Sequence, residues 1–364
     1  MKEIIRIGKK EKIEDFISKI EGKKPLFICV IGNTETAKIP SISAAGANPD
    51  ITDYTPAADM EYLIYEKCKS IEGVPITPDG IPTPALITKA SIDLAEISLL
   101  VASGGLNIHP QTPFLEFGGQ PGKNISNGLA LNKVSSVFER AKILGEQISK
   151  AVDYLVIGES VAGGTTTALG VLTAMGFDAS NKISSSLPKN PIGLKIKTVK
   201  LGLKNAGIVA GDLKNEPLKA IKLLGDPMQP VHAGIVIGAA ERIPVLLAGG
   251  TQMSAVLAIV NSINPLISKN LAIGTTRWII EDKQADLKGL IDQINPDIPI
   301  LGANLNFNQM KYDGLKAYEQ GVVKEGVGAG GSVIASILST KGMISIDQIH
   351  QKIKDNYRRI VLNE

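Results

Sequence analysis

Two glutamates in this sequence have surroundings that suit acid–base chemistry. Glu325 opens the glycine-rich run at 325–332, and Glu159 follows an apolar run at 154–157 and precedes a Gly-Gly-Thr turn. A loop with so few side chains lets a ligand approach the backbone closely. A carboxylate there can take a proton from an N–H group of a neutral ring. The alternative, that each glutamate caps a helix or pairs with a lysine such as the adjacent Lys324, stays open.

The run from Gly326 to Gly331 also matches Gly-x-Gly-x-x-Gly, the pattern of dinucleotide-binding loops. That loop must open a β-α-β unit with an acidic residue at the end of the next strand. Only 33 residues follow Gly331, and their pattern is helical. We therefore reject a nicotinamide-dinucleotide site. We expect instead that N–H groups at the start of the following helix face an anion.

Four predicted strands end in glycines that are followed by hydroxyl or amide side chains. The residues are Gly104 and Gly105, Gly163 and Gly164 with Thr165, Gly249 and Gly250 with Thr251, and Gly274 with Thr275 and Thr276. Each one alone could be an ordinary tight turn. Parallel strands end at one edge of a sheet, however, so the repetition predicts one shared crevice there. Hydroxyls at helix starts can donate to a phosphate, and the candidates are Thr165, Thr166, Thr167 and Thr251.

The sequence gives little support to metal or thiol chemistry. Its three histidines, His109, His232 and His350, have no ligand spacing, and its two cysteines, Cys29 and Cys68, add none. Cys29 lies in an apolar run and is predicted to be a core thiol. His232 is predicted to be a packed, hydrogen-bonded histidine. We expect neither a metal nor a cofactor.

The charges are nearly balanced and are spread along the chain. The net charge is +3 from 39 basic and 36 acidic residues, and no basic stripe indicates binding to nucleic acid. No apolar run reaches about 18 residues, so no membrane span is expected. With no secretion signal and no disulfide framework, we expect a cytoplasmic protein. One lysine excess is interpreted as the solvated face of a helix or strand, namely Lys195, Lys197, Lys200 and Lys204.

The elements that must position the candidate residues alternate between strands and helices. This alternation predicts an α/β fold with a doubly wound, mainly parallel sheet. Residues 25–325 are expected to form a large α/β domain that holds the crevice. The amphipathic ends, 1–24 and 326–364, are predicted to pair into a small helical domain. The buried strands are predicted at 25–31, 97–102, 154–157, 244–248, 271–276 and 298–303.

The ordered motifs resemble those of the nicotinate-nucleotide–dimethylbenzimidazole phosphoribosyltransferases. Residues 324–329 look like that family's Gly-Glu-Gly-Thr-Gly-Ala signature, and 158–166 are similar to its Gly-Glu-Met motif leading to Asn-Thr-Thr. Residues 243–250 look like its Val-Pro-Val-Val-x-Asp-Gly segment, and 103–108 resemble its Asn-Gly-Gly-Ala-Ala-Ile segment. The motifs stand in the family's order.

This resemblance implies a Rossmann-like parallel sheet with a small helical domain, in a homodimer. It implies phosphoribosyl transfer from nicotinate mononucleotide to a benzimidazole-type base, which releases nicotinate and gives α-ribazole 5′-phosphate for the lower ligand of cobamides. Carried over by position, Glu325 matches the general base and Glu159 the second carboxylate of the site. Together with the turns above, the expected substrate-binding residues are Ser103, Gly104, Gly105, Leu106, Gly163, Gly164, Thr165, Thr166, Gly249, Gly250, Thr251, Thr275, Gly326 and Gly328.

Three features depart from the bacterial members of that family. Ala248 stands where they have an aspartate, and residues 274–278 replace a histidine-rich segment. The N-terminal third, with its long turn-rich connection at 33–56, looks like a divergent, archaeal-type branch. The identity of the aromatic base therefore stays open. The departures also motivate an alternative, a non-catalytic protein that binds a nucleotide or a cobamide precursor.

Overall fold

An eight-stranded sheet runs through the part of the chain that the computed structural model describes, which is residues 3–45, 51–77 and 80–362. Part of the predicted 33–56 connection, residues 46–50, lies outside the described residues. The strands are β1 (Ile4–Ile7), β2 (Pro25–Gly32), β3 (Ser98–Gly105), β4 (Leu115–Glu116), β5 (Tyr154–Ser160), β6 (Val245–Ala248), β7 (Leu271–Thr276) and β8 (Ile300–Ala303).

The strand order is β1-β8-β7-β6-β5-β2-β3-β4. All neighbours are parallel except β1, which pairs with β8 in the antiparallel direction. From β2 the chain first builds outward through β3 and β4, then returns to the other side of β2 for β5 to β8. The predicted doubly wound, mainly parallel sheet is therefore confirmed. Its order reverses between β2 and β5, which is where such sheets place ligands.

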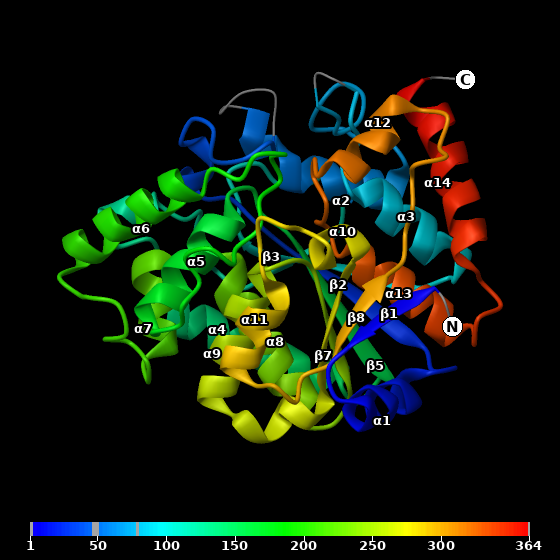
Figure 1. Ribbon diagram of the computed structural model, residues 1–364. Coiled ribbons are helices and arrows are strands. Elements are labelled where there is room, and N and C mark those ends of the chain that lie inside the picture. The colour runs from blue at the N-terminus through cyan, green and yellow to red at the C-terminus, as the bar shows by residue number, and fades with distance from the viewer. Residues whose placement is uncertain (1–2, 46–50, 78–79, 363–364) are drawn as a thin grey trace.

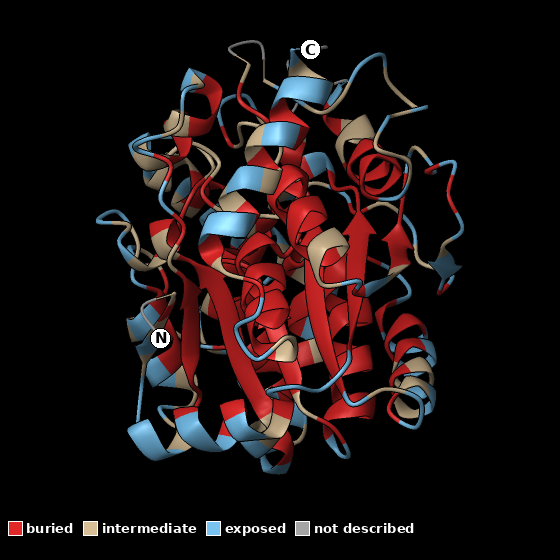
Figure 2. Ribbon diagram, turned by 90° about the vertical axis from the view of Figure 1, so that its right-hand side faces the viewer, coloured by how far each residue is buried: buried red, intermediate tan, exposed pale blue. Residues whose placement is uncertain are grey.

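Side chains alternate between the two faces of the sheet and feed two separate cores. In β2, Leu26, Ile28 and Val30 join one core, whereas Phe27 and Ile31 join the other. This period of two is the geometry of a strand with both faces covered. Figure 2 shows most of the sheet in the buried colour, with the exposed colour on the outer helices, on loops and on the short strand β4.

Helices cover both faces (Figure 1). The first core includes residues of helices on one face, namely α4 (Val134–Ile148), α5 (Gly164–Ala174), α6 (Ile192–Ala206), α7 (Pro217–Leu224), α8 (Met228–Ala240), α9 (Gln252–Ile263) and α11 (Leu287–Ile294). The second core includes residues of α1 (Lys10–Ile20), α2 (Thr55–Tyr65), α3 (Ala85–Leu94), α13 (Ala329–Ser339) and α14 (Ile346–Val361). The short helices are η1 (Glu35–Lys38), η2 (Ile51–Tyr54), η3 (Ile125–Asn127), η4 (Pro265–Asn270), α10 (Arg277–Ile280), α12 (Asp313–Lys316) and η5 (Ala317–Gln320).

The two chain ends are tied to the sheet and to each other. Residues 4–7, predicted within a helical end segment, form β1 instead, because the free edge of β8 accepts their backbone groups. The carboxylate of Glu3 accepts a hydrogen bond from the backbone N–H of Ile346 at 3.0 Å. Helix α13 packs against β5 to β8 rather than standing away from the sheet. A small domain built from 1–24 and 326–364 stays a prediction.

Candidate functional site

A cavity of about 640 Å³ opens at the carboxyl end of the sheet, next to β5. Its walls come from segments that are far apart in sequence. Five of them are the end of β5 with the turn after it at 159–165, the segment 184–186, the turn after β6 at 250–252, the loop 323–327 and the connection from α2 to α3. Residues 43–45, the stretch from Ile51 to Asp59 and Ile279 complete the lining. Two of the four repeated turns, those with Gly163 and Gly250, line this cavity, whereas those with Gly104 and Gly274 do not. The cavity lies beside the point where the strand order reverses.

Glu325 lies on the cavity wall, and backbone groups hold its carboxylate. The two oxygens accept hydrogen bonds from the backbone N–H groups of Gly326 (3.1 Å), Thr276 (2.9 Å) and Gly330 (3.2 and 3.3 Å). The Thr275 hydroxyl donates a longer one at 3.4 Å. Burial raises the pKa of Glu325 to about 7, although these donors act in the opposite direction. The carboxylate is therefore poised to exchange a proton near neutral pH.

The loop that carries Glu325 is conformationally strained. Val323, Lys324 and Val327 adopt φ values of 65°, 53° and 53°, in the left-handed region that branched side chains rarely enter. Surrounding groups hold them there: the Val327 N–H donates to the Glu159 carbonyl at 2.8 Å, and the Thr276 hydroxyl donates to the Lys324 carbonyl at 2.6 Å. Strain that the rest of the fold enforces is found at functional sites more often than elsewhere.

The glycines after Glu325 serve mainly to pack helix α13 onto the sheet. A β-carbon on Gly330 would lie 2.0 Å from the backbone of Thr275, and one on Gly331 would lie 2.3 Å from the side chain of Ala248. One N–H at the helix start, that of Gly330, already donates to Glu325. The expectation that this helix start faces a substrate anion is therefore corrected: the anion that it faces is Glu325. The missing aspartate is also explained, because Ala248 fills the space beneath the helix.

Glu159 is the second carboxylate of the cavity. Its Oε2 accepts from the backbone N–H of Val161 at 2.9 Å, and its Oε1 lies against the side-chain amide of Gln252. Burial, together with the negative charges of Asp226, Glu325 and Asp59, raises the pKa of Glu159 to about 8. At pH 7 this carboxyl is therefore mostly neutral, whereas Glu325, with the lower pKa, is ionised to a larger extent and is the more available of the two to accept a proton.

Two further buried carboxylates near Glu159 were not among the sequence candidates. Asp59, on α2, lines the cavity and accepts hydrogen bonds from the hydroxyls of Thr83 and Ser160. Asp226 accepts from the Thr167 hydroxyl and from the backbone at the start of α8. Burial raises the pKa of each to about 6. A sequence signal existed for Asp59, a carboxylate in an otherwise apolar helix start.

The other end of the cavity is rich in donors. Lys195 has no exposed surface, and its ammonium donates to the Thr165 hydroxyl at 2.9 Å and to the Ser184 carbonyl at 2.7 Å. Burial, together with the charge of Lys324, lowers the pKa of Lys195 to about 7. The prediction that Lys195 belongs to a solvated face is wrong; Lys197, Lys200 and Lys204 are exposed on the same helix. Of these four lysines, Lys195 is the one on the side of α6 that packs against α5, so its side chain points inward.

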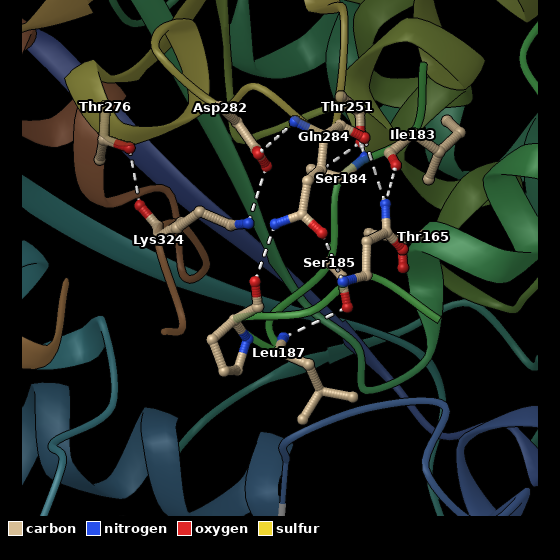
Figure 3. A network of polar contacts seen from close by, with 12 residues as sticks. Thr165, Ile183, Ser184, Ser185, Leu187, Thr251, Thr276, Asp282, Gln284 and Lys324 are labelled. Carbon is tan, nitrogen blue, oxygen red and sulfur yellow. Dashed lines mark hydrogen bonds and ion pairs between the residues drawn. The ribbon is translucent and has the colours of Figure 1, made fainter. Parts of the chain in front are cut away.

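Polar side chains form a network around this donor-rich end (Figure 3). The backbone N–H of Ser184 donates to the Thr251 hydroxyl at 3.0 Å, and the two hydroxyls lie 3.0 Å apart. Lys324 reaches Asp282 at 2.7 Å, and both side chains are nearly inaccessible to solvent. The network fixes the hydroxyl groups of residues 184–186 and 251 on the cavity wall. We name this part of the cavity, which Thr165 also lines and Lys195 supports from behind, the anion end.

The opposite end of the cavity is mostly apolar. It is lined by the α2–α3 connection and by the strained loop, with Ile71, Val74, Ile76, Pro84 and Val327 among the residues. We name this part the base end. A flat aromatic ring would find apolar contact here, with the Glu325 carboxylate at its edge.

The structure brings many, but not all, of the predicted site residues together. Those that line the cavity are Glu159, Glu325, Gly163, Gly164, Thr165, Gly250, Thr251 and Gly326. Thr275 lies behind the wall and contacts Glu325. Those that do not line the cavity are Ser103, Gly104, Gly105, Leu106, Thr166, Gly249 and Gly328.

The glycines at the end of β3 have a packing role in this structure. A β-carbon on Gly104 would lie 2.0 Å from the backbone of Pro227, and one on Gly105 would lie 2.3 Å from the backbone of Gln120. Gly328 is likewise pressed against the ring of Phe27. The sequence correctly indicated that another group comes close to these glycines. That group is part of the protein rather than a ligand.

Other side chains bear on the expected chemistry. Cys29 is buried, as predicted for a core thiol. His232 is buried, but neither ring nitrogen has a hydrogen-bond partner, so that part of its prediction is wrong. Within the described residues, no group of three or more His, Cys, Asp or Glu side chains could hold a metal ion. In the same part of the chain, no helix has the length and hydropathy needed to cross a membrane.

Comparison with known proteins gives both close sequence relatives and more distant structural ones. No family model matches the chain. The UPF0284 protein of Sulfolobus acidocaldarius is 44% identical over 351 residues, which cover 93% of this chain and 99% of the relative. The UPF0284 protein of Methanothermobacter thermautotrophicus is 40% identical and covers 94% of each chain. That of Methanocaldococcus jannaschii is 45% identical, with coverages of 89% and 91%.

Two solved structures share the fold. The nicotinate-nucleotide–dimethylbenzimidazole phosphoribosyltransferase of Thermus thermophilus matches with a TM-score of 0.59 at 13% identity, covering 94% of each chain. A CobT structure from the same organism matches with a TM-score of 0.57 at 15% identity, covering 92% of this chain and 91% of its own. At such identity the likeness concerns the fold, and it agrees with the family that the sequence motifs resemble.

Proposed function

The chain belongs to the UPF0284 protein family, and we propose that it is a phosphoribosyltransferase. It transfers the phosphoribosyl group of nicotinate mononucleotide to a benzimidazole-type base, giving α-ribazole 5′-phosphate and nicotinate for cobamide lower-ligand synthesis. Support comes from the shared fold, from the ordered motifs and from a cavity with an apolar end and an anion end. The observation that carries the proposal is Glu325, buried on the cavity wall with a pKa of about 7.

The reaction asks little more of the protein than positioning and proton removal. One ring nitrogen of the base attacks C1′ of the ribose with its lone pair, and the bond from C1′ to the pyridinium nitrogen breaks. That electron pair neutralises the pyridinium, so nicotinate leaves without needing a proton. The other ring nitrogen then carries an acidic N–H, and Glu325 takes its proton. No oxidant or reductant enters the balance.

The anion end suits the 5′-phosphate of the donor nucleotide. Thr165 and residues 184–186 line it, and the buried Lys195 ammonium lies behind this wall, where it donates to the Thr165 hydroxyl and the Ser184 carbonyl. A phosphate would stabilise the charged form of Lys195 and so raise its depressed pKa. Glu159, neutral near pH 7, can lie next to Glu325 without adding a second full negative charge.

Replacing Glu325 tests the proposal directly. Glu325→Gln keeps the shape of the side chain but removes the proton acceptor, so transfer from nicotinate mononucleotide to dimethylbenzimidazole should fall at least about 100-fold. Glu241→Gln, at the exposed end of α8, is the matched control and should keep full activity. Nicotinate and α-ribazole phosphate are measured by chromatography, and circular dichroism checks the fold. Full activity in Glu325→Gln would refute the assignment of the base.

The same assay separates the enzyme from the alternative, a non-catalytic binding protein. Calorimetry measures whether the wild-type protein binds nicotinate mononucleotide, and the turnover assay measures whether nicotinate is released. Binding without release, with any of several benzimidazoles, would assign the chain to the binding class. A homodimer in the cytoplasm is also proposed from the resemblance, and light scattering of the purified protein tests the dimer.

A further inference from the structure

Three polar side chains form one patch on the wall of the base end. Asp59 lies on α2, Thr83 lies just before α3, and Ser160 ends β5. All three line the cavity. The Oδ1 of Asp59 accepts from the Thr83 hydroxyl at 2.7 Å, and its Oδ2 accepts from the Ser160 hydroxyl at 2.7 Å. We name these three residues the acceptor wall.

The direction of these hydrogen bonds is fixed by the chemistry of the groups. An ionised carboxylate can only accept hydrogen bonds, so the single O–H of each hydroxyl must be the donor to Asp59. Only lone pairs then remain on the two hydroxyl oxygens, and one of them on Thr83 accepts from the backbone N–H of Ala85 at 3.3 Å. Asp59 is only 2% exposed, and no Lys, Arg or His forms an ion pair with it in the part of the chain that the structure describes. The wall therefore offers acceptors and no donors.

The acceptor wall stands close to Glu325. Thr83 is followed by Pro84, whose side chain would lie 3.3 Å from a β-carbon on Gly326, the residue after Glu325. Ser160 directly follows Glu159, whose pKa is raised by the charges of both Glu325 and Asp59. A ring whose N–H faces Glu325 would therefore present another part of its edge to this wall.

A ligand that binds against the acceptor wall must supply the hydrogen-bond donors. Resting on the proposed function, we propose that the accepted base is an aromatic nitrogen heterocycle with a donor substituent, an amino or hydroxyl group that donates to the acceptor wall. The other side chains that face the base end do not remove this need. Glu325 and Glu159 are themselves carboxyl groups. Hydroxyls also line the cavity at Tyr54, Thr55, Ser70 and Thr77. In the part of the chain that the structure describes, none of these hydroxyls donates to Asp59, Thr83 or Ser160.

The expected preference between bases follows from the unpaired acceptors that an apolar substituent would leave on the acceptor wall. A methyl group against the wall would cover the lone pairs of Asp59 and Ser160 without pairing them, and a buried acceptor without a partner is unfavourable. A site built to hydrogen-bond a substituent can reject an analogue that lacks it far more strongly than a simple apolar pocket can. We expect a preference of about tenfold or more for the donor-bearing base.

Three benzimidazoles of similar size test the proposal. The 5-amino compound brings a donor, the 5-methyl compound brings neither donor nor acceptor, and the 5-methoxy compound brings only an acceptor. With nicotinate mononucleotide as donor, kcat/KM should follow the order amino, methyl, methoxy. In Asp59→Asn the side-chain amide donates to one hydroxyl, which then turns its own proton into the cavity. The kcat/KM for the amino compound should fall and that for the methoxy compound should rise, so that the ratio of the two kcat/KM values falls at least about tenfold.

Two controls keep the result specific. Asp292→Asn removes a carboxylate from the exposed side of α11 and should leave all three rates unchanged. Ser160→Ala removes one hydroxyl without changing the charge and should also reduce the preference for the amino compound. Thermal melting of each variant shows whether the fold is kept.

The possible failures are distinguishable. Equal kcat/KM for the three bases in the wild type, or an unchanged ratio in Asp59→Asn, would overturn the acceptor wall while leaving the phosphoribosyl transfer intact. An equal loss with all three bases in Asp59→Asn, carried by a higher KM for nicotinate mononucleotide, would assign the wall to the ribose hydroxyls and also overturn the proposal. No transfer to any base by the wild type would refute the proposed function itself, and the inference with it.

Discussion

A general base works best when its pKa lies near the working pH, because it is then both ionised and basic enough to take a proton. The pKa of Glu325 is raised to about 7 by burial. The ionised fraction, and with it kcat, should therefore rise as the pH increases through about 7 and then level off. A pH profile of kcat between 5.5 and 8.5 measures this. A flat profile over that range would show that the ionisation of Glu325 does not limit turnover.

Lys195 gives a second prediction for a single side chain. Lys195→Met keeps the length of the side chain but removes the charge that lies behind the Thr165 hydroxyl at the anion end, so the KM for nicotinate mononucleotide should rise at least about tenfold with a smaller change in kcat. Lys197→Met, on the exposed face of the same helix, is the control and should leave KM unchanged. A loss confined to kcat would place Lys195 in proton transfer rather than in phosphate binding.

At the scale of the element, helix α13 is the part that sets the position of Glu325. Its glycines let the helix approach β6 and β7 closely, and the N–H of Gly330 holds the carboxylate. Gly330→Ala would force the helix away from Thr275 and should reduce the free energy of unfolding by more than about 2 kcal/mol. Activity should fall as well, because the carboxylate would lose a donor.

A glycine in open space is the matched control for that change. Gly193 lies in helix α6, and a β-carbon there would meet no atom within 4 Å. Gly193→Ala should therefore stabilise the protein by about 0.5–1 kcal/mol, because alanine loses less backbone entropy in a helix. Denaturant titration measures both variants. Equal effects of the two substitutions would contradict the close packing of α13.

At the scale of the whole molecule, the buried carboxyl of Glu159 links stability to pH. Its pKa is raised from an ordinary 4.5 to about 8 in the folded protein. Above pH 4.5 the unfolded chain loses this proton first, so the folded state becomes progressively less favoured up to about pH 8, where the full cost is present. Glu159→Gln removes the cost. Its free energy of unfolding relative to the wild type should increase by a few kcal/mol from about pH 5 to pH 8.5.

Denaturant unfolding at those two pH values measures this difference, and Glu241→Gln serves as the control for an exposed glutamate. The comparison of two pH values isolates the ionisation, because any packing change caused by the substitution is present at both. A difference that stays constant with pH would show that Glu159 ionises as freely in the folded protein as in the unfolded chain.

Sequence reasoning located the fold and much of the site, for a physical reason. The apolar runs of the strands and the glycines at their ends are local patterns, and local patterns report the buried faces and tight turns of a parallel sheet. Glu159 and Glu325 could be predicted from local sequence in the same way, since each is a carboxylate beside an apolar run and a glycine-rich turn. The segment that forms β1 was missed because its pairing depends on the distant edge of β8.

What the sequence by itself determined is the sheet, its crevice and two of its carboxylates. What only the tertiary structure decided is which side chains meet there. Lys195 looked like its exposed neighbours until the packing of α6 turned it inward, and the glycine run looked like ligand space until α13 was seen to fill it. The acceptor wall joins residues 59, 83 and 160, which only the fold brings within hydrogen-bond distance. The direction of a side chain, and the partners that set its pKa, depend on contacts between distant segments, which no local pattern encodes.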